Sequence, residues 1–218
     1  MTDIPILATD TVVLNIRNWK LKVLLIEMNK EPFIGKWAVP GGFIWAEDLA
    51  EESAHKVLFE ATNVKDLYLE QLKVFDAIDR DPKTRVVSIG YMAIIKKDDL
   101  SIRANKRYTG IDWFDIDNLP ELAYDHEDII KCALERLKWK ITYSTISLTL
   151  VPNEFTLTEL QEVFEIVLWK KIDKRNFRKK ILKQKVIKET GNKKTIGVTR
   201  PATLYKANKK DIKFVEMI

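Results

Sequence analysis

Residues 35–64 read GKWAVPGGFIWAEDLAEESAHKVLFEATNV, and this stretch decides the fold. The segment Trp37–Val39 predicts a short strand, and the pair Gly41-Gly42 that follows it predicts a turn. Apolar residues then recur at helical spacing, which predicts an amphipathic helix over 48–62. Its inward face is expected to hold Leu49, Ala54, Val57, Leu58 and Ala61.

The two ends of this helix carry recognisable signals. Asp48, followed three residues later by Glu51, predicts a capping box at the start. Asn63 stands at the end, where it is the commonest substitute for glycine in a left-handed helix terminus. A strand, a glycine pair and a capped helix are therefore expected in direct succession.

The same stretch resembles the Nudix box of pyrophosphate-cleaving enzymes. An intact box runs Gly, five residues, Glu, seven residues, Arg-Glu, then Glu-Glu and a final Gly. Gly42 takes the place of the first glycine here, which puts Asp48 at the first Glu, Lys56 at the Arg and Glu60 at the first residue of the Glu-Glu pair. A register shifted by one residue loses Glu60, so the first alignment is preferred.

The carboxylates that such a box needs are mostly missing. Diphosphate hydrolysis uses divalent ions that require several oxygen ligands in a fixed geometry. Val57 and Ala61 occupy two of the three ligand positions on the helix and leave Glu60 alone. The resemblance therefore implies the Nudix fold with no catalytic residues, no metal and no cofactor. Independently of any resemblance, the residues also fit an ordinary amphipathic helix.

Composition places the chain among soluble globular proteins. Its 218 residues suit one large domain or two small ones, and no apolar run approaches the length of a membrane span. The N-terminus has no basic region before an apolar segment, and Cys132 is the single cysteine. We expect a cytoplasmic protein without membrane contact. Two separated histidines, His55 and His126, and one cysteine predict no metal cluster.

Charge divides the chain into two unlike parts. Residues 151–218 hold 17 Lys and Arg against 8 Asp and Glu, a net charge of +9, whereas residues 1–150 hold 20 against 24, a net charge of −4. Such an asymmetry indicates that the C-terminal part meets a polyanion. A solvated lysine-rich surface is the alternative if charge alone is considered.

The first part reads as strands and helices in alternation. Strands are expected near Ile6–Ile16, Leu21–Met28, Leu67–Asp76, Arg85–Ile95 and Ile111–Phe114, and a helix over Asp125–Ile141. The segment 142–155 is almost uncharged and contains Pro152, which places a domain boundary there. We expect a domain over 1–145 and a second over 146–218.

The second part predicts two helices and a hairpin. Thr156 and Glu159 form a capping box at the start of a helix with a broad apolar face. Asp173 is expected to cap a second helix over Lys174–Lys185, whose apolar stripe is narrow. Short strands near Val186–Thr190 and Ala202–Lys206 flank a basic loop. These are the elements of a winged helix, whose second helix enters the major groove of DNA. The fold class expected is α+β, a Nudix-like α/β/α sandwich followed by a winged helix-turn-helix domain.

Cations on the second helix and the wing would neutralise phosphates, while an asparagine or arginine could read base edges. The residues expected to bind DNA are Lys174, Arg175, Asn176, Arg178, Lys179, Lys180, Lys183, Lys193, Lys194 and Arg200. Recognition of RNA by this domain is a third possibility, although the sequence lacks an aromatic stacking surface for single-stranded bases.

The run FTLTELQEVFEIVLWKKIDKRNFRKKILKQKVIKETG and the later RPATLYK resemble the winged-helix domain of Nudix-related transcriptional regulators. The segment VFDAIDRDPKTRVVSIGY at 74–91 also resembles these regulators and the related ADP-ribose pyrophosphatases. The resemblance implies a homodimer on a palindromic operator in double-stranded DNA. It further implies a small-molecule effector, either ADP-ribose or a pentose such as arabinose, in control of NAD-metabolism or sugar-utilisation genes.

A sensor that has lost hydrolysis can keep its pocket. Candidate effector-binding residues are Trp37, Trp45, Asp79, Arg80, Asp81 and Arg85. Structural roles compete at each position, because 79–82 suits a turn and a tryptophan is most often a core residue. Lys56 in place of arginine and the absent metal ligands favour a neutral sugar slightly over a diphosphate. A repressor is thus the leading hypothesis, and an active hydrolase of ADP-ribose or a related nucleoside diphosphate derivative is the alternative.

Overall fold

A computed structural model describes residues 4–64, 67–95, 108–195, 201–208 and 212–218. The chain forms two compact units, each taken by itself below. The first holds the described residues of 1–15, 22–95 and 99–135, and the second those of 16–21 and 136–218. No helix within the described ranges is long and apolar enough to cross a membrane.

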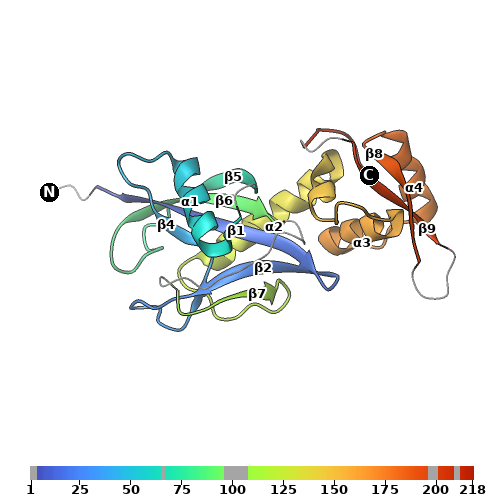
Figure 1. Ribbon diagram of the computed structural model, residues 1–218. Coiled ribbons are helices and arrows are strands. Elements are labelled where there is room, and N and C mark those ends of the chain that lie inside the picture. Colours follow the sequence, from blue (N-terminus) through green and yellow to red (C-terminus); the bar gives the residue numbers. More distant parts are fainter. Residues whose placement is uncertain (1–3, 65–66, 96–107, 196–200, 209–211) are drawn as a thin grey trace. The chain divides into compact units, whose positions relative to one another are not determined.

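A mixed sheet forms the centre of the first unit (Figure 1). Its main path runs β3-β2-β1-β6-β5, while β4 pairs with β1 and β7 pairs with β2. Antiparallel pairs surround one parallel pair, β1 with β6, which runs from the Ile6–Val86 pair to the Leu14–Ile94 pair. The strands are β1 Ile6–Arg17, β2 Lys20–Glu27, β3 Trp37–Ala38, β4 Gly41–Phe43, β5 Tyr68–Phe75, β6 Val86–Ile94 and β7 Ile111–Asp115.

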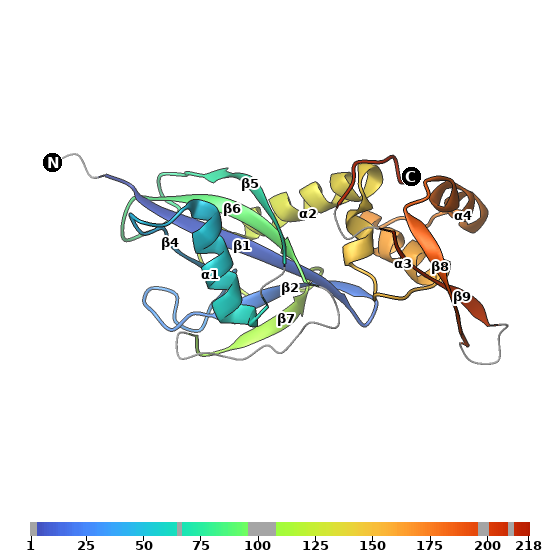
Figure 2. The same cartoon turned by 45° about the horizontal axis from the view of Figure 1, so that its top comes forward.

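Two helices cover this sheet on opposite faces. Helix α1, Ala50–Thr62, crosses in front of β1, and α2, His126–Tyr143, lies behind the sheet (Figures 1 and 2). Every residue from Ala8 to Ile16 of β1 is buried, as a strand covered on both faces must be. Leu58 of α1 packs with Val13, Leu24 and Ala93 of three strands. The predicted α/β/α sandwich is confirmed.

The glycine pair is part of a strand and does not form the predicted turn. Gly41 and Gly42 belong to β4, which pairs antiparallel with β1, so that Gly41 lies opposite Asp10 and Gly42 opposite Thr9. A Cβ atom on Gly41 would stand 2.3 Å from Oδ1 of Asp10 and 2.8 Å from the backbone oxygen of Thr9. Glycine is therefore required at position 41 by the close approach of Asp10.

Helix α1 begins two residues later than predicted. Its first cap is Leu49, whose N–H donates to the Glu52 carboxylate, while Asp48 forms an ion pair with Lys56. Leu49 is 68% exposed and does not face the core, contrary to expectation. Asn63 ends the helix with a φ of 56°, the left-handed conformation predicted for it.

The second unit contains α3 Leu157–Leu168, α4 Lys174–Lys183, β8 Ile187–Lys194 and β9 Ala202–Ala207, with a short 3-10 helix over Thr145–Thr149. The predicted caps are confirmed, because the hydroxyl of Thr156 accepts from the Glu159 N–H and the Asp173 carboxylate accepts from the Asn176 N–H. Phe164 and Phe177 meet edge to face and join the two helices. Two helices and a two-stranded wing constitute the predicted winged helix.

Strand β8 is longer than the sequence predicted. It continues through Gly191, whose φ of 83° lies in the left-handed region, and the pairing with β9 shifts register between Glu189 and Lys193. Glycine makes this bulge possible without ending the strand.

Candidate functional site

A pocket opens in the first unit where β1, β2 and β4 meet the chain before α2. Its walls combine apolar, aromatic and charged groups, the composition typical of small-molecule sites. It is lined by Ala8, Asp10, Ile26, Glu27, Met28, Asn29, Lys30, Ala38, Val39, Gly41, Gly42, Phe43, Arg80, Asp81, Val86, Tyr108, Tyr124 and His126.

A buried ionic network forms one wall of this pocket. Nη2 of Arg80 donates to Oδ2 of Asp10 at 2.9 Å and to Oδ1 of Asp125 at 2.7 Å, while Nε reaches Oδ2 of Asp125 at 3.0 Å. The Ser88 hydroxyl donates to the same Asp10 oxygen at 2.7 Å. Arg80 and Asp10 are each about 7% exposed, so water screens their interaction little.

The network fixes the charge states of its members. Burial alone raises the pKa of Asp10, but the combined attraction of His126 and Arg80 and the hydrogen bond from Ser88 hold it well below the usual range. Burial lowers the pKa of Arg80, and its bonds to Asp125 and Asp10 raise it more. An ionised carboxylate and a guanidinium therefore persist beneath the pocket at neutral pH.

Aromatic groups close another side. Nδ1 of His126 accepts from the Val39 N–H at 3.1 Å, and its Nε2 lies 3.5 Å from Oδ1 of Asp10. The Tyr124 ring lies 5.2 Å from the His126 ring and 4.4 Å from Phe33. Tyr124 has a φ of 55°, an unusual backbone for a bulky residue, which turns its ring to the pocket.

Two of the six predicted effector-binding residues line the pocket, namely Arg80 and Asp81. Arg80 is engaged by two carboxylates, and Asp81 accepts from the N–H groups of Lys83 and Thr84 in its own turn. Both residues thus shape the pocket as well as face it.

The other four do not line it. The Arg85 guanidinium donates to the carbonyl groups of Asp76 and Ala77 and thereby fixes the loop that contains Asp79. Trp37 packs edge to face on Phe114, with ring centroids 4.6 Å apart, and Trp45 is 66% exposed.

Sequence reasoning missed Asp10, Tyr124 and His126 as residues of one pocket. A signal existed for Asp10, because it is the single charged residue in the otherwise uncharged run ILATDTVVLNI. Buried charges are rare unless they are paired. Nothing local in the sequence indicated its partners, which stand 70 and more positions away.

The remnant Nudix positions are dispersed. Gly42 lines the pocket, Lys56 is paired with Asp48, and Val57 and Ala61 are buried against the sheet. No acidic residue between 47 and 60 lines the pocket. Across the part of the chain that the structure describes, no three His, Cys, Asp or Glu residues gather as metal ligands.

Helix α4 presents the candidate nucleic-acid interface of the second unit. Phe177 and Ile181 are buried and dock the helix, whereas its other faces are cationic. The predicted DNA-binding residues exposed on this helix and on β8 are Lys174, Arg175, Asn176, Lys179, Lys183, Lys193 and Lys194.

Three predicted DNA-binding residues have partners of their own. Lys180 forms an ion pair with Glu216 at 2.7 Å, Lys194 reaches Glu159 at 2.6 Å, and Arg178 donates to the Thr158 hydroxyl at 3.2 Å. These bonds hold the helix and the wing to their own domain. Arg200 lies outside the described residues.

Family profiles match both units. The profile described as a NUDIX domain matches residues 7–136, and the profile described as the NrtR DNA-binding winged helix domain matches residues 147–207. The ADPR responsive transcriptional repressor NtrR of Acinetobacter baylyi is 32% identical over 96% of this chain and 85% of its own.

Solved structures agree with this similarity. The NrtR protein of Shewanella oneidensis, complexed with a 27mer DNA, superposes with a TM-score of 0.83 at 32% identity over 93% of both chains. The NUDIX domain of the same protein, complexed with ADP ribose, gives a TM-score of 0.56 at 30% identity over 62% of this chain and 90% of that chain.

Proposed function

Because the chain belongs to the family of Nudix-related transcriptional regulators of the NrtR type, we propose that it is a repressor that releases its operator when ADP-ribose occupies the pocket. The observation that carries the proposal is the joint presence of a pocket that no carboxylate of the box lines and a docked cationic helix. As a regulator of transcription, it would act in the cytoplasm, where bacterial relatives meet the chromosome.

Helix α4 supports the DNA-binding half of the proposal. Its N-terminus is fixed by Asp173 and its apolar stripe by the contact with Phe164, so the exposed cations stand on a rigid element. Lys174, Arg175 and Lys179 lie on the exposed faces, where they can neutralise phosphates. The Shewanella relative was solved on DNA with the same fold.

The pocket supports the effector half. ADP-ribose offers a base to stack, ribose hydroxyls and a diphosphate, and the pocket offers Tyr124 and Tyr108, polar groups, and Lys30 on its exposed rim. The similarity to an ADP-ribose complex outweighs the slight preference for a pentose, which rested on Lys56 and the missing metal ligands. Lys56 pairs with Asp48 and does not line the pocket, so it bears little on the choice.

The proposed regulator acts as a homodimer. A two-fold protein places two copies of α4 on two half-sites, which would lie about one helical turn or a multiple apart. The control of NAD-metabolism genes is part of the same proposal. The predicted domain boundary near residue 145 would separate the effector-binding domain from the DNA-binding domain.

The DNA-binding half is tested by selecting an operator from random duplexes and measuring its affinity against salt. We expect affinity to fall steeply with salt, with a log-log slope set by the phosphates contacted. A slope near zero would exclude the phosphate contacts. A fragment ending at residue 145 should stay folded and lose the operator.

The effector half is tested by thermal shift with ADP-ribose and arabinose in parallel. A ligand that binds only the folded state raises the melting temperature, and ADP-ribose is expected to do so. Tyr124→Asn removes the ring but keeps a residue that tolerates the left-handed backbone. This variant should keep operator binding and lose the response to ADP-ribose. A rise in melting temperature with arabinose alone would show that the effector is a pentose and not ADP-ribose.

The same protein should not turn over ADP-ribose in the presence of magnesium. No acidic residue of α1 lines the pocket, and among the described residues no three carboxylate, histidine or cysteine side chains gather as ligands for the metal that diphosphate hydrolysis requires. Clear hydrolysis that Glu60→Gln abolishes would show that the protein is an enzyme.

A further inference from the structure

Helix α4 of the second unit presents a neutral amide among its exposed cations. All ten residues of α4 are described, and the exposed ones are Lys174, Arg175, Asn176, Lys179, Leu182 and Lys183. Four of these six side chains are positively charged and can neutralise phosphates. Asn176 has no charge, so it adds nothing to the counterion release that draws cations onto a DNA backbone.

Asn176 lies on the side of α4 that faces away from its own domain. Phe177 and Ile181 are buried and mark the inward side of the helix. Lys179 and Lys183 follow Asn176 at the spacing of three and seven residues that places side chains on one helical face. Asn176 is therefore the N-terminal member of an outward face that is otherwise cationic.

Helix stability does not account for an asparagine at this position. Asn176 is the third residue of α4. The third residue of α1 is Glu52 and that of α3 is Glu159, and each carboxylate accepts from the backbone N–H at the start of its helix. Asparagine is a weaker helix former than glutamate, lysine or arginine. A glutamate on α4 would repel phosphates, but a lysine or arginine would attract them, so the choice of an amide has another cause.

The backbone that carries Asn176 is held in place. The Asp173 carboxylate accepts from the Asn176 N–H at 2.8 Å. The preceding turn is fixed by Glu165 of α3, which accepts from the Lys171 ammonium at 2.7 Å and from the Ile172 N–H at 3.1 Å.

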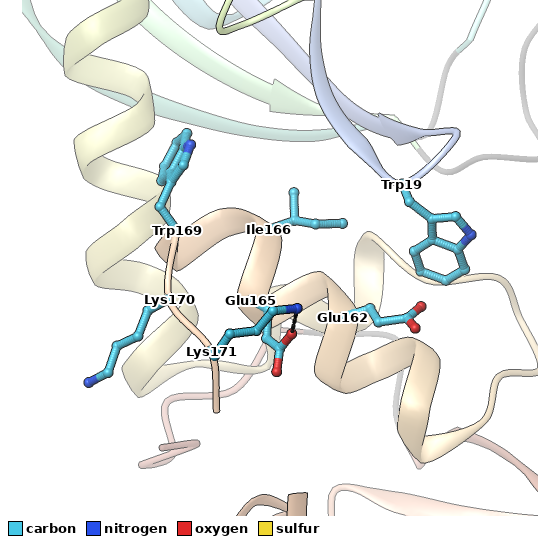
Figure 3. Close-up of a pocket in the computed structure, with 7 residues that line it drawn as sticks. All are labelled: Trp19, Glu162, Glu165, Ile166, Trp169, Lys170 and Lys171. Atoms are coloured by element: carbon cyan, nitrogen blue, oxygen red, sulfur yellow. Dashed lines mark hydrogen bonds and ion pairs between the residues drawn. The ribbon is translucent and has the colours of Figure 1, made fainter. Parts of the chain in front are cut away.

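Figure 3 shows Lys171 pointing to Glu165 at the wall of the pocket that both residues line. The hydrogen bond from Lys171 is the largest cause that lowers the pKa of Glu165, to about 2, so this carboxylate is ionised at neutral pH. The first turn of α4 is thus mounted on a fixed turn, as the reading of a base edge requires.

The chemistry of the amide narrows the base that it can read. A primary amide has an acceptor oxygen and an NH₂ donor, and the removal of both from water costs free energy unless both find partners. In the major groove, adenine offers a matching pair, the acceptor N7 beside the donor N6. Guanine presents two acceptors, cytosine a single donor, and thymine an acceptor beside a methyl group.

We propose that the Asn176 side chain reads one adenine in each half-site of the operator, through hydrogen bonds to N6 and N7. The first turn of the second helix is where helix-turn-helix domains contact base edges. This inference rests on the proposed function and names the residue that gives it sequence specificity, whereas Arg175 and Lys179 neutralise phosphates.

The test uses the full chain and an operator selected from random duplexes. Each base pair of the operator is replaced in turn, and fluorescence anisotropy measures the affinity of the native chain and of Asn176→Ala. The native chain should lose about tenfold in affinity at one A·T pair of each half-site, and Asn176→Ala should not discriminate there. At that pair 7-deazaadenine, which keeps base pairing but lacks the N7 acceptor, should weaken the native chain and leave Asn176→Ala unchanged.

Three further variants separate base reading from other roles. Asn176→Asp keeps the shape and suits a helix N-terminus, but it removes the donor and should also lose the preference for adenine. Lys179→Ala should weaken binding to all sequences alike and lower the log-log salt slope by about one, whereas Asn176→Ala should keep the native slope. Asn118→Ala, at an exposed residue of the first unit, should change neither discrimination nor slope.

The outcomes distinguish this inference from the proposed function. Full discrimination by Asn176→Ala at every pair, an equal loss at all pairs, or a lost preference for a base other than adenine would overturn the role of Asn176 while operator binding stands. A native chain that selects no operator with salt-dependent affinity would overturn the proposed function, and this inference with it.

Discussion

The guanidinium of Arg80 holds the buried carboxylate of Asp10, with Nη2 2.9 Å from Oδ2. The two residues stand 70 positions apart, and their bond ties β1 to the loop before β6 at the wall of the pocket. The shape of the pocket wall therefore depends on the ion pair between Arg80 and Asp10.

Replacement of Arg80 by Met should destabilise the protein by about 3–5 kcal/mol, because it leaves the carboxylate of Asp10 buried without its cation. Urea denaturation of the full chain measures the loss. Lys83→Met, at an exposed residue of the same loop, is the control and should change the free energy of unfolding by less than about 0.5 kcal/mol. A similar small change for both variants would show that the ion pair contributes nothing.

The stability should fall in acid in a way that Asp10 partly explains. The folded-state pKa of Asp10 is below its unfolded value, so its contribution is complete above about pH 4 and is lost as the pH falls towards the folded pKa. Asp10→Asn should therefore be less stable than the native chain at pH 7, and the two unfolding free energies should converge below about pH 4. Parallel curves across that range would contradict this assignment.

Gly41→Ala should destabilise the protein, because it forces strand β4 away from strand β1 at the wall of the pocket. Its Cβ atom would meet Oδ1 of Asp10 at 2.3 Å and the Thr9 carbonyl at 2.8 Å, so a loss of about 1–3 kcal/mol is expected. Gly110→Ala is the matched control, because the nearest atom there, at 2.8 Å, is the flexible end of Glu27. The control should lose less stability by thermal denaturation, and a reversed order would refute the steric argument.

Asp173→Ala should loosen the start of α4. The Asp173 carboxylate accepts from the Asn176 N–H at 2.8 Å, and loss of such a cap costs about 0.5–2 kcal/mol. Asp173→Ser keeps a capping oxygen and should retain most of the stability. Urea denaturation distinguishes the two, and equal losses would mean that the carboxylate acts through charge.

Two cations of α4 should differ in their effect on the operator. Arg175 is exposed and makes no ion pair with another described residue, whereas Lys180 is held by Glu216. Arg175→Ala should weaken operator binding and lower the salt slope by about one. Lys180→Ala should affect binding less and stability more. The reverse order, measured by fluorescence anisotropy across salt concentrations, would assign the phosphate contact to Lys180.

Local patterns in the sequence were sufficient for most elements. The buried strands, the capping box at Thr156, the cap at Asp173 and the left-handed Asn63 depend on neighbouring residues, and each was confirmed. The start of α1 was wrong because Asp48, the expected cap, pairs with Lys56 on the following turns of the helix. The Asp48 carboxylate could either cap the backbone at the helix start or pair with the Lys56 ammonium, and in the folded helix it pairs with Lys56.

The sequence by itself determined the fold class and the two-domain organisation of this protein, since helix periodicity, turn residues and the division of charge can be read from short segments. The tertiary structure alone decided the pocket. Asp10, Arg80, Asp125 and His126 come together only when β1, a loop and α2 meet around one sheet. It also decided why position 41 holds glycine, since a Cβ atom there would collide with Asp10 on the paired strand. Contacts between distant segments follow from packing in three dimensions, which no local pattern specifies.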